Sequence, residues 1–583
     1  MKKRLIALLC LAAVFLGVFA FGATAASDGD GLYDVGYAKV DVNPWIKTSS
    51  VYYLNPGNSV SVGIPDNSAN WKDLQQGATV NNVITIDVSN PSKPGSTIKV
   101  PFVKVPMAGY GTYASASCES LLDDNGDGVI GLGDGLHATA TSVTDDWGST
   151  VIYITIDSIG GYAGLTTSLR QSIPAALKEL TGKDVITADK IMVSANHSHN
   201  AVNIDTCRAE YLKYENGTHV NQDEDGNATT ALGAYFQHYL KKVTDAAVQA
   251  YQNAVPATMS KGAIDVSNAL GYQMNFVRHY NVKATDKSGK VESGLVKGPN
   301  FGPTAGDAAT KKVSYVAGSA AYQSHLYEAD DMLYVLKFTP KNTSIKPVVF
   351  VNWRAHSTIV SGSSKTYLSA DYASSLRRFM ENAGYRPAFW QGAAGNIVPS
   401  SSDPTINASS NSNYWVNIRR TDLGITFKTS ESSSSDHNLT YQAVLYGKLL
   451  TEATVKCLES KMTNLSAGPI RTKQFSFTAN TQEVEQGSGM AAAALYWESL
   501  GKPKNNVYPL KYKYTDGKTY ILNSYFHANN MLNSYKSSTK TATYELNAIT
   551  LGERVAMVTS PCEMFDRYDL GGSNAAANND WLD

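Results

Sequence analysis

Short apolar runs alternate with longer amphipathic stretches through most of the chain. The short runs are rich in β-branched and aromatic residues, and they predict strands at 150–159, 190–195, 332–338, 348–353 and 388–391. Apolar residues recur at helical spacing in four longer stretches, which predicts helices at 163–180, 231–254, 369–383 and 441–461. Strands that alternate with helices predict an α/β fold, mixed α+β, in which mixed β-sheets are flanked by helices.

Polar stretches separate these elements. Residues 400–413 and 429–438 are rich in Ser, Thr and Asn, and 285–312 is rich in Gly and Lys, so all three predict surface loops. Near the end of the chain, two short runs at 544–549 and 554–559 flank a Leu-Gly-Glu turn and predict a hairpin. The sequence shows no internal repeat and no strong interdomain linker.

The first residues have the pattern of a targeting segment. Three basic residues follow Met1, and an apolar run from Leu5 to Phe21 leads to the small residues Ala23-Thr24-Ala25. This order predicts a secretory signal peptide over residues 1–25. The alternative is an uncleaved membrane anchor, because about 17 apolar residues lie at the lower limit for crossing a bilayer. We therefore expect an exported protein, secreted or at the cell surface.

Composition and charge narrow the classes of function. The 583 residues are 43% hydrophobic and 10% aromatic, which is too apolar for a disordered chain. Lys and Arg number 50 against 51 Asp and Glu, so a net charge of -1 gives no basic surplus for phosphate binding. We expect no nucleic-acid partner. The cysteines beyond the leader show no CxxC spacing, so each can be a disulfide partner or a buried apolar residue; they are Cys118, Cys207, Cys457 and Cys562.

Three predicted strand ends carry groups that can bind a metal. His197 and His199 follow the strand at 190–195, His356 follows the strand at 348–353, and Glu563 follows the hairpin. Ligands collect outside the carboxyl ends of strands in open sheets, and residues two apart in an extended segment face the same side. Two imidazoles and a carboxylate form a frequent catalytic zinc set. On spacing alone, the alternative of ordinary polar histidines stays open.

Six segments resemble motifs of the neutral/alkaline, non-lysosomal ceramidases and occur in the family's order. They are VGYAKVDVNP at 35–44, MAGYG at 107–111, NHSH at 196–199, NWRAH at 352–356, SADY at 369–372 and QGAAGNIVP at 391–399. The resemblance extends from Val35 to Glu563. It implies one large catalytic domain over 33–583, without the family's C-terminal immunoglobulin-like domain.

The resemblance implies a single zinc ion and a set of residues around it. His197, His356 and Glu563 match the family's zinc ligands. His199 matches its non-ligand catalytic histidine, which takes and returns a proton. Arg278 resembles the arginine that steadies the developing oxyanion, with an exposed loop salt bridge as the alternative.

Two further residues are expected behind the ligands, and several positions depart from the family pattern. Asp371 would orient a ligand histidine or, equally, cap a helix, and Asn396 stands where the family usually has Asp. Val398 occupies the position of a family serine, so no serine nucleophile acts there. The family's tyrosine ligand has no counterpart before Asp583. We therefore expect either a C-terminally truncated chain or an incomplete site.

A separate motif predicts calcium binding. Residues 123–134 match the calcium-loop pattern, with Gly128 at the sharp turn. The expected ligands are Asp123, Asn125, Asp127, Asp134 and the carbonyl of Val129. We expect a calcium-stabilised loop inserted in the catalytic domain. The alternative is a Gly- and Asp-rich turn that binds nothing.

These features lead to an expected function with two alternatives. We expect a secreted zinc-dependent amidohydrolase that cleaves the N-acyl bond of ceramide or a related N-acyl lipid to a fatty acid and a sphingoid base, at or near a membrane surface. The first alternative is a zinc hydrolase of the same fold that acts on another amide or ester. The second is a non-catalytic, calcium-stabilised binding protein at the cell surface. The sequence does not indicate an oligomeric state.

Overall fold

The computed structural model describes the segments that build one large sheet and its surroundings. These are residues 31–44, 105–107, 136–215, 217–271, 274–277, 330–360, 367–395, 397–399, 435–480 and 541–561, together with short strands at 52–55, 58–60, 83–87, 97–101, 116–117, 122–123, 279–285, 291–297, 426–427, 510–513 and 519–522. The predicted signal peptide at 1–25 lies outside them. Among the described residues, none of the helices is both long enough and apolar enough to cross a bilayer.

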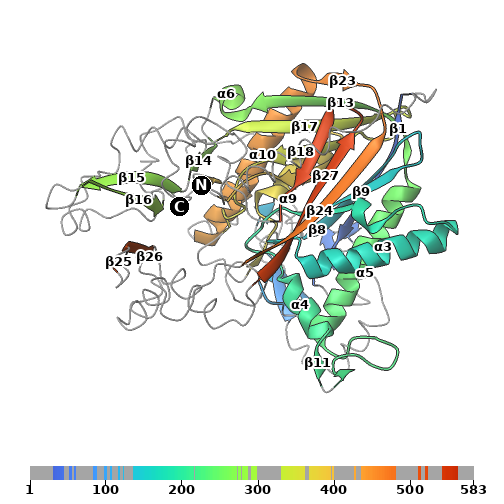
Figure 1. The fold of residues 1–583 in the computed structure, drawn as a ribbon, viewed down its shortest axis with the longest axis horizontal. Helices are drawn as coiled ribbons and strands as arrows, with labels where there is room; N and C mark the ends of the chain where they lie inside the picture. The colour runs from blue at the N-terminus through green and yellow to red at the C-terminus, as the bar shows by residue number, and fades with distance from the viewer. Residues whose placement is uncertain are drawn as a thin grey trace.

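Nine strands form the central sheet (Figure 1). Two pairs are parallel, β9 with β10 and β18 with β20, and the other pairs are antiparallel. The sheet is mixed and helices flank it, which confirms the predicted fold class. Its order is β10 (Ile191–Ala195), β9 (Thr150–Ile156), β8 (His137–Thr144), β1 (Tyr33–Asp41), β13 (Val255–Asp265), β17 (Met332–Pro340), β18 (Val348–Trp353) and β20 (Arg386–Gln391), with β23 (Thr463–Leu465) paired to β13.

A crossover helix joins the strands of each parallel pair. Helix α3 (Ala163–Thr181) connects β9 to β10, and α9 (Tyr372–Asn382) connects β18 to β20. Parallel neighbours need such a connection because the chain must return to the starting edge of the sheet. The loops with the predicted metal ligands follow the carboxyl ends of β10 and β18.

The sheet curls so that its two ends pack face to face. The Tyr153 ring of β9 lies 5.3 Å from the Phe350 ring of β18 and 5.4 Å from the Trp390 ring of β20, measured between centroids. These strands are far apart in the strand order, so only a curved sheet brings the rings into contact. The curl brings the loops after β10 and β18 together.

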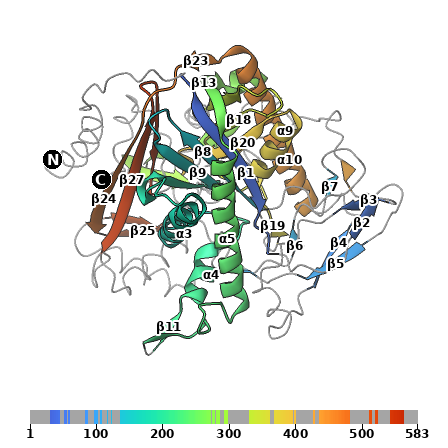
Figure 2. The same cartoon turned by 90° about the vertical axis from the view of Figure 1, so that its right-hand side faces the viewer.

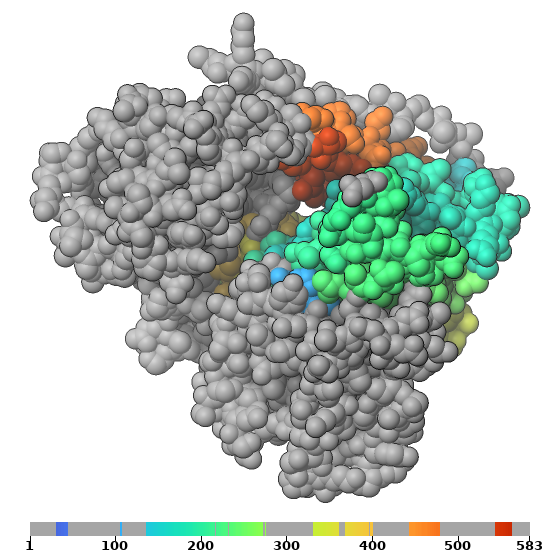
Figure 3. All heavy atoms as spheres, turned by 90° about the horizontal axis from the view of Figure 1, so that it is seen from below, coloured from blue at the N-terminus to red at the C-terminus, as the bar shows by residue number. Residues whose placement is uncertain are grey.

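Helices cover the outside of both ends. Helices α3, α4 (Ile204–Tyr211) and α5 (Ala231–Gln252) pack on the end that contains β8 to β10, and α9 and α10 (Ser435–Ser460) pack on the end that contains β17 to β20 (Figure 2). The green atoms of the segment with α4 and α5 form a broad part of the surface seen from below (Figure 3). At Gly36 of β1, an added Cβ would lie 1.8 Å from the Ala250 carbonyl oxygen of α5, so glycine permits this close packing.

A small sheet closes the inner core. It consists of β24 (Ile470–Asn480), β27 (Thr541–Leu551) and β28 (Val555–Thr559), which are antiparallel. Ile470, Ile549 and Leu551 are buried against the inner face of the large sheet. The β27–β28 pair is the hairpin predicted from the sequence.

Most predicted elements are present with bounds within a few residues. Two predicted loops are partly wrong, since 285–312 contains β16 (Val291–Lys297), paired with β15 (His279–Thr285), and α10 begins at Ser435. Alternation and apolar content are weak in both segments, so local pattern did not reveal them. Cys207 and Cys457 are buried free thiols, and Cys118 and Cys562 lie outside the described residues.

Candidate metal centre

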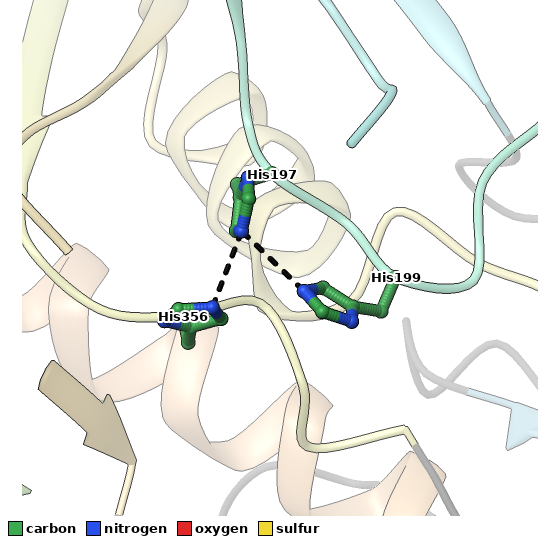
Figure 4. Close-up of side chains that lie close together, drawn as sticks. All are labelled: His197, His199 and His356. Atoms are coloured by element: carbon green, nitrogen blue, oxygen red, sulfur yellow. Dashed lines mark hydrogen bonds between the residues drawn. The ribbon is translucent and has the colours of Figure 1, made fainter. Parts of the chain in front are cut away.

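Three histidines from two loops meet at the carboxyl ends of β10 and β18 (Figure 4). His197 Nε2 lies 3.2 Å from His356 Nε2 and 3.4 Å from His199 Nε2. One potential ligand atom from each residue lies within 4.8 Å of the others. His356 is buried, and His197 and His199 are half-buried. The structure therefore brings together the three histidines that the sequence singled out, and the group could hold a metal ion.

Backbone carbonyls fix the tautomers of two of these rings. His197 Nδ1 lies 2.7 Å from the Ile159 carbonyl oxygen, and His356 Nδ1 lies 2.7 Å from the Ala394 carbonyl oxygen. A carbonyl oxygen only accepts, so each Nδ1 must donate. In the neutral rings, each Nε2 then carries a lone pair and no proton.

Two lone pairs therefore face each other at the centre of the cluster. Neutral His197 and His356 cannot share a hydrogen bond through Nε2, because both atoms are acceptors. Their close approach is compatible with a metal ion held between them. With metal–nitrogen bonds of about 2.05 Å and tetrahedral angles, two zinc-bound nitrogens lie about 3.3 Å apart. The 3.2 Å between His197 Nε2 and His356 Nε2, the two expected histidine ligands, matches that spacing.

Direct hydrogen bonds join the two loops. Ser198 and Ser357 form an isolated parallel β-bridge, and His199 N donates to the Ser357 carbonyl oxygen at 3.3 Å. The Ser357 hydroxyl donates to the Asn196 carbonyl oxygen at 2.7 Å. The bridge links the two ends of the curled sheet, so the distance between the histidines is set by backbone pairing.

A buried polar network supports the loop that carries His197. The Asn196 carboxamide oxygen accepts from Ser158 N and Ser198 N, and its Nδ2 donates to Asp157 Oδ1 and to the Ala370 carbonyl oxygen. His197 itself has φ of 60°, a left-handed conformation that is uncommon for a residue with a side chain. The Asn196 contacts on both sides of His197 hold this turn.

Asp371 caps helix α9, one of the two roles expected of it. Its carboxylate accepts from Tyr372 N and Val360 N, both at 2.8 Å. Burial raises the pKa of Asp371 to about 6, against the lowering effect of these backbone hydrogen bonds. Backbone carbonyls, and not Asp371, accept from the Nδ1 atoms of His197 and His356.

Several expected site residues lie outside the described residues, so their roles stay predictions. They are Glu563, Arg278, Asn396 and the calcium-loop residues Asn125, Asp127, Val129 and Asp134. Asp123 lies in the short strand β7 (Leu122–Asp123), which pairs with β22 (Thr426–Phe427). Val398 lies in β21 (Ile397–Pro399), next to His356, whose backbone N donates to the Ile397 carbonyl oxygen.

Sequence reasoning missed the residues that support the loops. Ser357 directly follows a predicted ligand, and its position there was the only available signal. Asp157 and Arg377 form a buried ion pair across 220 residues of chain. Nothing local in the sequence indicates such a pair.

The comparisons with known proteins identify structural neighbours only. No protein-family model and no curated sequence matches the chain. Neutral ceramidase from Pseudomonas aeruginosa aligns with 90% of this chain and 61% of its own, at 11% identity and a TM-score of 0.41. A ceramidase complexed with C2 aligns with 89% of this chain and 62% of its own, at 11% identity and a TM-score of 0.40. The chain thus spans less than two thirds of the length of these solved ceramidases.

Proposed function

We propose that this chain is an exported zinc-dependent amidohydrolase that cleaves the N-acyl bond of ceramide or a related N-acyl lipid. The observation that carries the proposal is the cluster of His197, His199 and His356, in which the Nε2 atoms of His197 and His356 lie 3.2 Å apart. The six ceramidase-like motifs, in the family's order, support the reaction type and the substrate class.

The donors present suit zinc. Imidazole nitrogens are common zinc ligands, and ligating histidines usually donate their second ring nitrogen to a carbonyl or carboxylate. His197 and His356 both have that arrangement. Glu563 is the proposed carboxylate ligand, from the segment after β28. Zinc, when bound, polarises an amide carbonyl and lowers the pKa of a water molecule toward neutrality.

The remaining chemistry is assigned to side chains of the chain. His199 is the proposed proton carrier, because its Nε2 lies at the cluster, 3.4 Å from His197 Nε2, and is half-buried. It would accept a proton from the attacking water and return it to the leaving amine nitrogen, so that the acid and the amine are released. Arg278 is the proposed partner of the developing oxyanion. Val398 offers no hydroxyl or thiol, so the proposed mechanism has no covalent intermediate at this position.

We further propose a calcium site and a route of export. Calcium would be bound by the loop at 123–134 and would stabilise it. Residues 1–25 would direct export, which would place the enzyme where it meets lipid at a membrane surface.

Release of labelled fatty acid from ceramide tests the proposed function. We expect the full chain to release it, a zinc chelator to abolish release, and added zinc to restore it. His356→Ala should be inactive, whereas Lys241→Met, which alters only an exposed ion pair on α5, should be fully active. Zinc-loaded protein that hydrolyses other N-acyl amides or esters but not ceramide would favour the first alternative. Zinc-loaded protein with no hydrolytic activity would contradict the proposal.

A further inference from the structure

Helix α9 and the residues that lead into it contact both histidine loops. On the His197 side, the Ser198 hydroxyl donates to the Ser369 carbonyl oxygen at 2.6 Å, and Asn196 Nδ2 donates to the Ala370 carbonyl oxygen at 3.2 Å. On the His356 side, the Tyr372 hydroxyl donates to the Ala355 carbonyl oxygen at 2.6 Å. One short segment therefore touches the residues that directly flank both histidines.

Arg377 extends this contact from within the helix. Its guanidinium binds the Asp157 carboxylate through two hydrogen bonds of 3.2 and 2.8 Å, and both side chains are buried, with 4% and 3% of Arg377 and Asp157 exposed. Asp157 Oδ1 also accepts from Asn196 Nδ2 at 3.0 Å. Burial keeps the two side chains of this ion pair in a fixed relative position, because a displacement would leave a buried charge without its partner.

This series of contacts ends at the turn with positive φ at His197. Asn196 precedes His197, and its carboxamide oxygen accepts from the amides of Ser158 and Ser198. Arg377 is thus connected to the turn at His197 through the side chains of Asp157 and Asn196, both of which are fully hydrogen-bonded. Tyr372 acts on the other loop by a single hydroxyl, at the residue directly before His356.

We propose that segment 369–377 positions both metal loops, with Arg377 acting on His197 through Asp157 and Asn196, and Tyr372 acting on His356 through Ala355. None of these side chains belongs to the histidine cluster, so they are positioning residues. The inference rests on the proposed metal site. In this proposal, metal affinity depends on α9 and the residues before it, which belong to the crossover connection between β18 and β20.

The test compares zinc affinity and unfolding for matched variants of the full chain. Arg377→Met removes the charge pair, Arg377→Lys retains the charge, and Tyr372→Phe removes one hydroxyl. Gly36→Ala is the control, because it disturbs the contact of β1 with α5, far along the chain from these loops. Zinc affinity is measured by competition with a chelator, and the visible spectrum of the cobalt-substituted proteins reports ligand geometry.

We expect Arg377→Met to weaken zinc binding by about 10- to 100-fold, the usual effect of losing an outer partner of a metal ligand. Tyr372→Phe should weaken it less, Arg377→Lys should recover part of the loss, and the cobalt spectrum should change in the Met and Phe variants. Gly36→Ala should destabilise the fold and leave the affinity and the spectrum unchanged.

Three results would overturn the inference. Arg377→Met and Tyr372→Phe could bind zinc as the parent does, which would refute the positioning role alone. An affinity loss no larger than that of Gly36→Ala would show a purely structural role. A parent chain that binds neither zinc nor cobalt would refute the metal site and the positioning role together. If Arg377→Met fails to fold, Tyr372→Phe still decides the question. In that variant the Ala355 carbonyl oxygen keeps a second donor, Gln391 Nε2.

Discussion

At the scale of single residues, the environment of each histidine determines what it can do. His197 and His356 have their Nδ1 atoms held by carbonyls, so their Nε2 atoms are prepared for a cation. The left-handed turn at His197 costs about 1–3 kcal/mol, a strain that persists only where surrounding contacts impose it. His199 lies two residues on, and its backbone pairs with Ser357.

The proposed division of roles predicts different losses in the three histidine variants. His199→Ala should retain zinc and lower kcat/KM by about 10²- to 10⁴-fold, because a proton carrier is lost. His197→Ala and His356→Ala should lose the zinc itself. Metal analysis of each purified variant, beside its rate of ceramide hydrolysis, checks this. Loss of zinc from His199→Ala, to the same degree as from His356→Ala, would make His199 a third ligand and contradict its assignment as proton carrier.

At the scale of elements, the amino terminus of α9 combines a cap with a buried carboxylate. The pKa of Asp371 is raised by burial to about 6, above its ordinary value of about 3.9. The unfolded chain therefore ionises first as the pH rises, and the folded state bears the cost of the buried charge. The contribution of Asp371 to stability is thus lost between about pH 4 and pH 6.

Replacing the Asp371 carboxylate should remove its contribution to the pH dependence of the free energy of unfolding. Asp371→Asn cannot ionise, so its free energy of unfolding relative to the parent should increase by about 3 kcal/mol between pH 4 and pH 7. Asn is isosteric with Asp and its carboxamide oxygen can still accept from Tyr372 N, so the uncommon backbone conformation at this position is shared by both proteins. Urea unfolding of both proteins at several pH values measures the difference. A difference that stays constant with pH would contradict the raised pKa.

A second element-scale prediction concerns the contact of β1 with α5. Gly36→Ala places a methyl group 1.8 Å from the Ala250 carbonyl oxygen, so strand and helix must move apart. Such overpacking should lower the free energy of unfolding by about 1–3 kcal/mol. Gly182→Ala at the end of α3, where no atom lies within 4 Å, tests φ strain without crowding. Unchanged stability of Gly36→Ala would contradict the close packing.

The elements also show how far the sequence can lead. The strand at 348–353 was predicted with its observed bounds, because a short run of β-branched and aromatic residues buried on both faces has a clear pattern. The three histidines were found because each follows such a run. The pairing of β1 with both β8 and β13 could not be predicted, since strand partners are set by tertiary packing. For the same reason the Asp157–Arg377 pair was invisible in the sequence.

At the scale of the whole molecule, the curl of the sheet makes the site. The loop after β10 and the loop after β18 belong to opposite ends of the strand order, and the Ser198–Ser357 bridge joins them. A metal held by His197 and His356 would tie the two ends together a second time, across 159 residues of chain. Folding and metal binding should therefore be linked.

This linkage predicts a rise in thermal stability with zinc. A ligand at 100 times its Kd stabilises the folded state by about 2.7 kcal/mol, which should raise the Tm of metal-stripped protein by several degrees. His356→Ala should show no such rise, and Lys241→Met should respond as the parent does. Thermal scans with and without zinc provide the measurement. An equal rise in His356→Ala would show that zinc acts at another place.

The most direct test is calorimetric titration of zinc into the metal-stripped full chain at pH 7.5. We expect saturable binding of about one zinc per molecule and loss of this site in His356→Ala. The short distance between His197 Nε2 and His356 Nε2 is the geometric basis of this expectation. Absence of binding, or weak binding that His356→Ala leaves unchanged, would contradict the account.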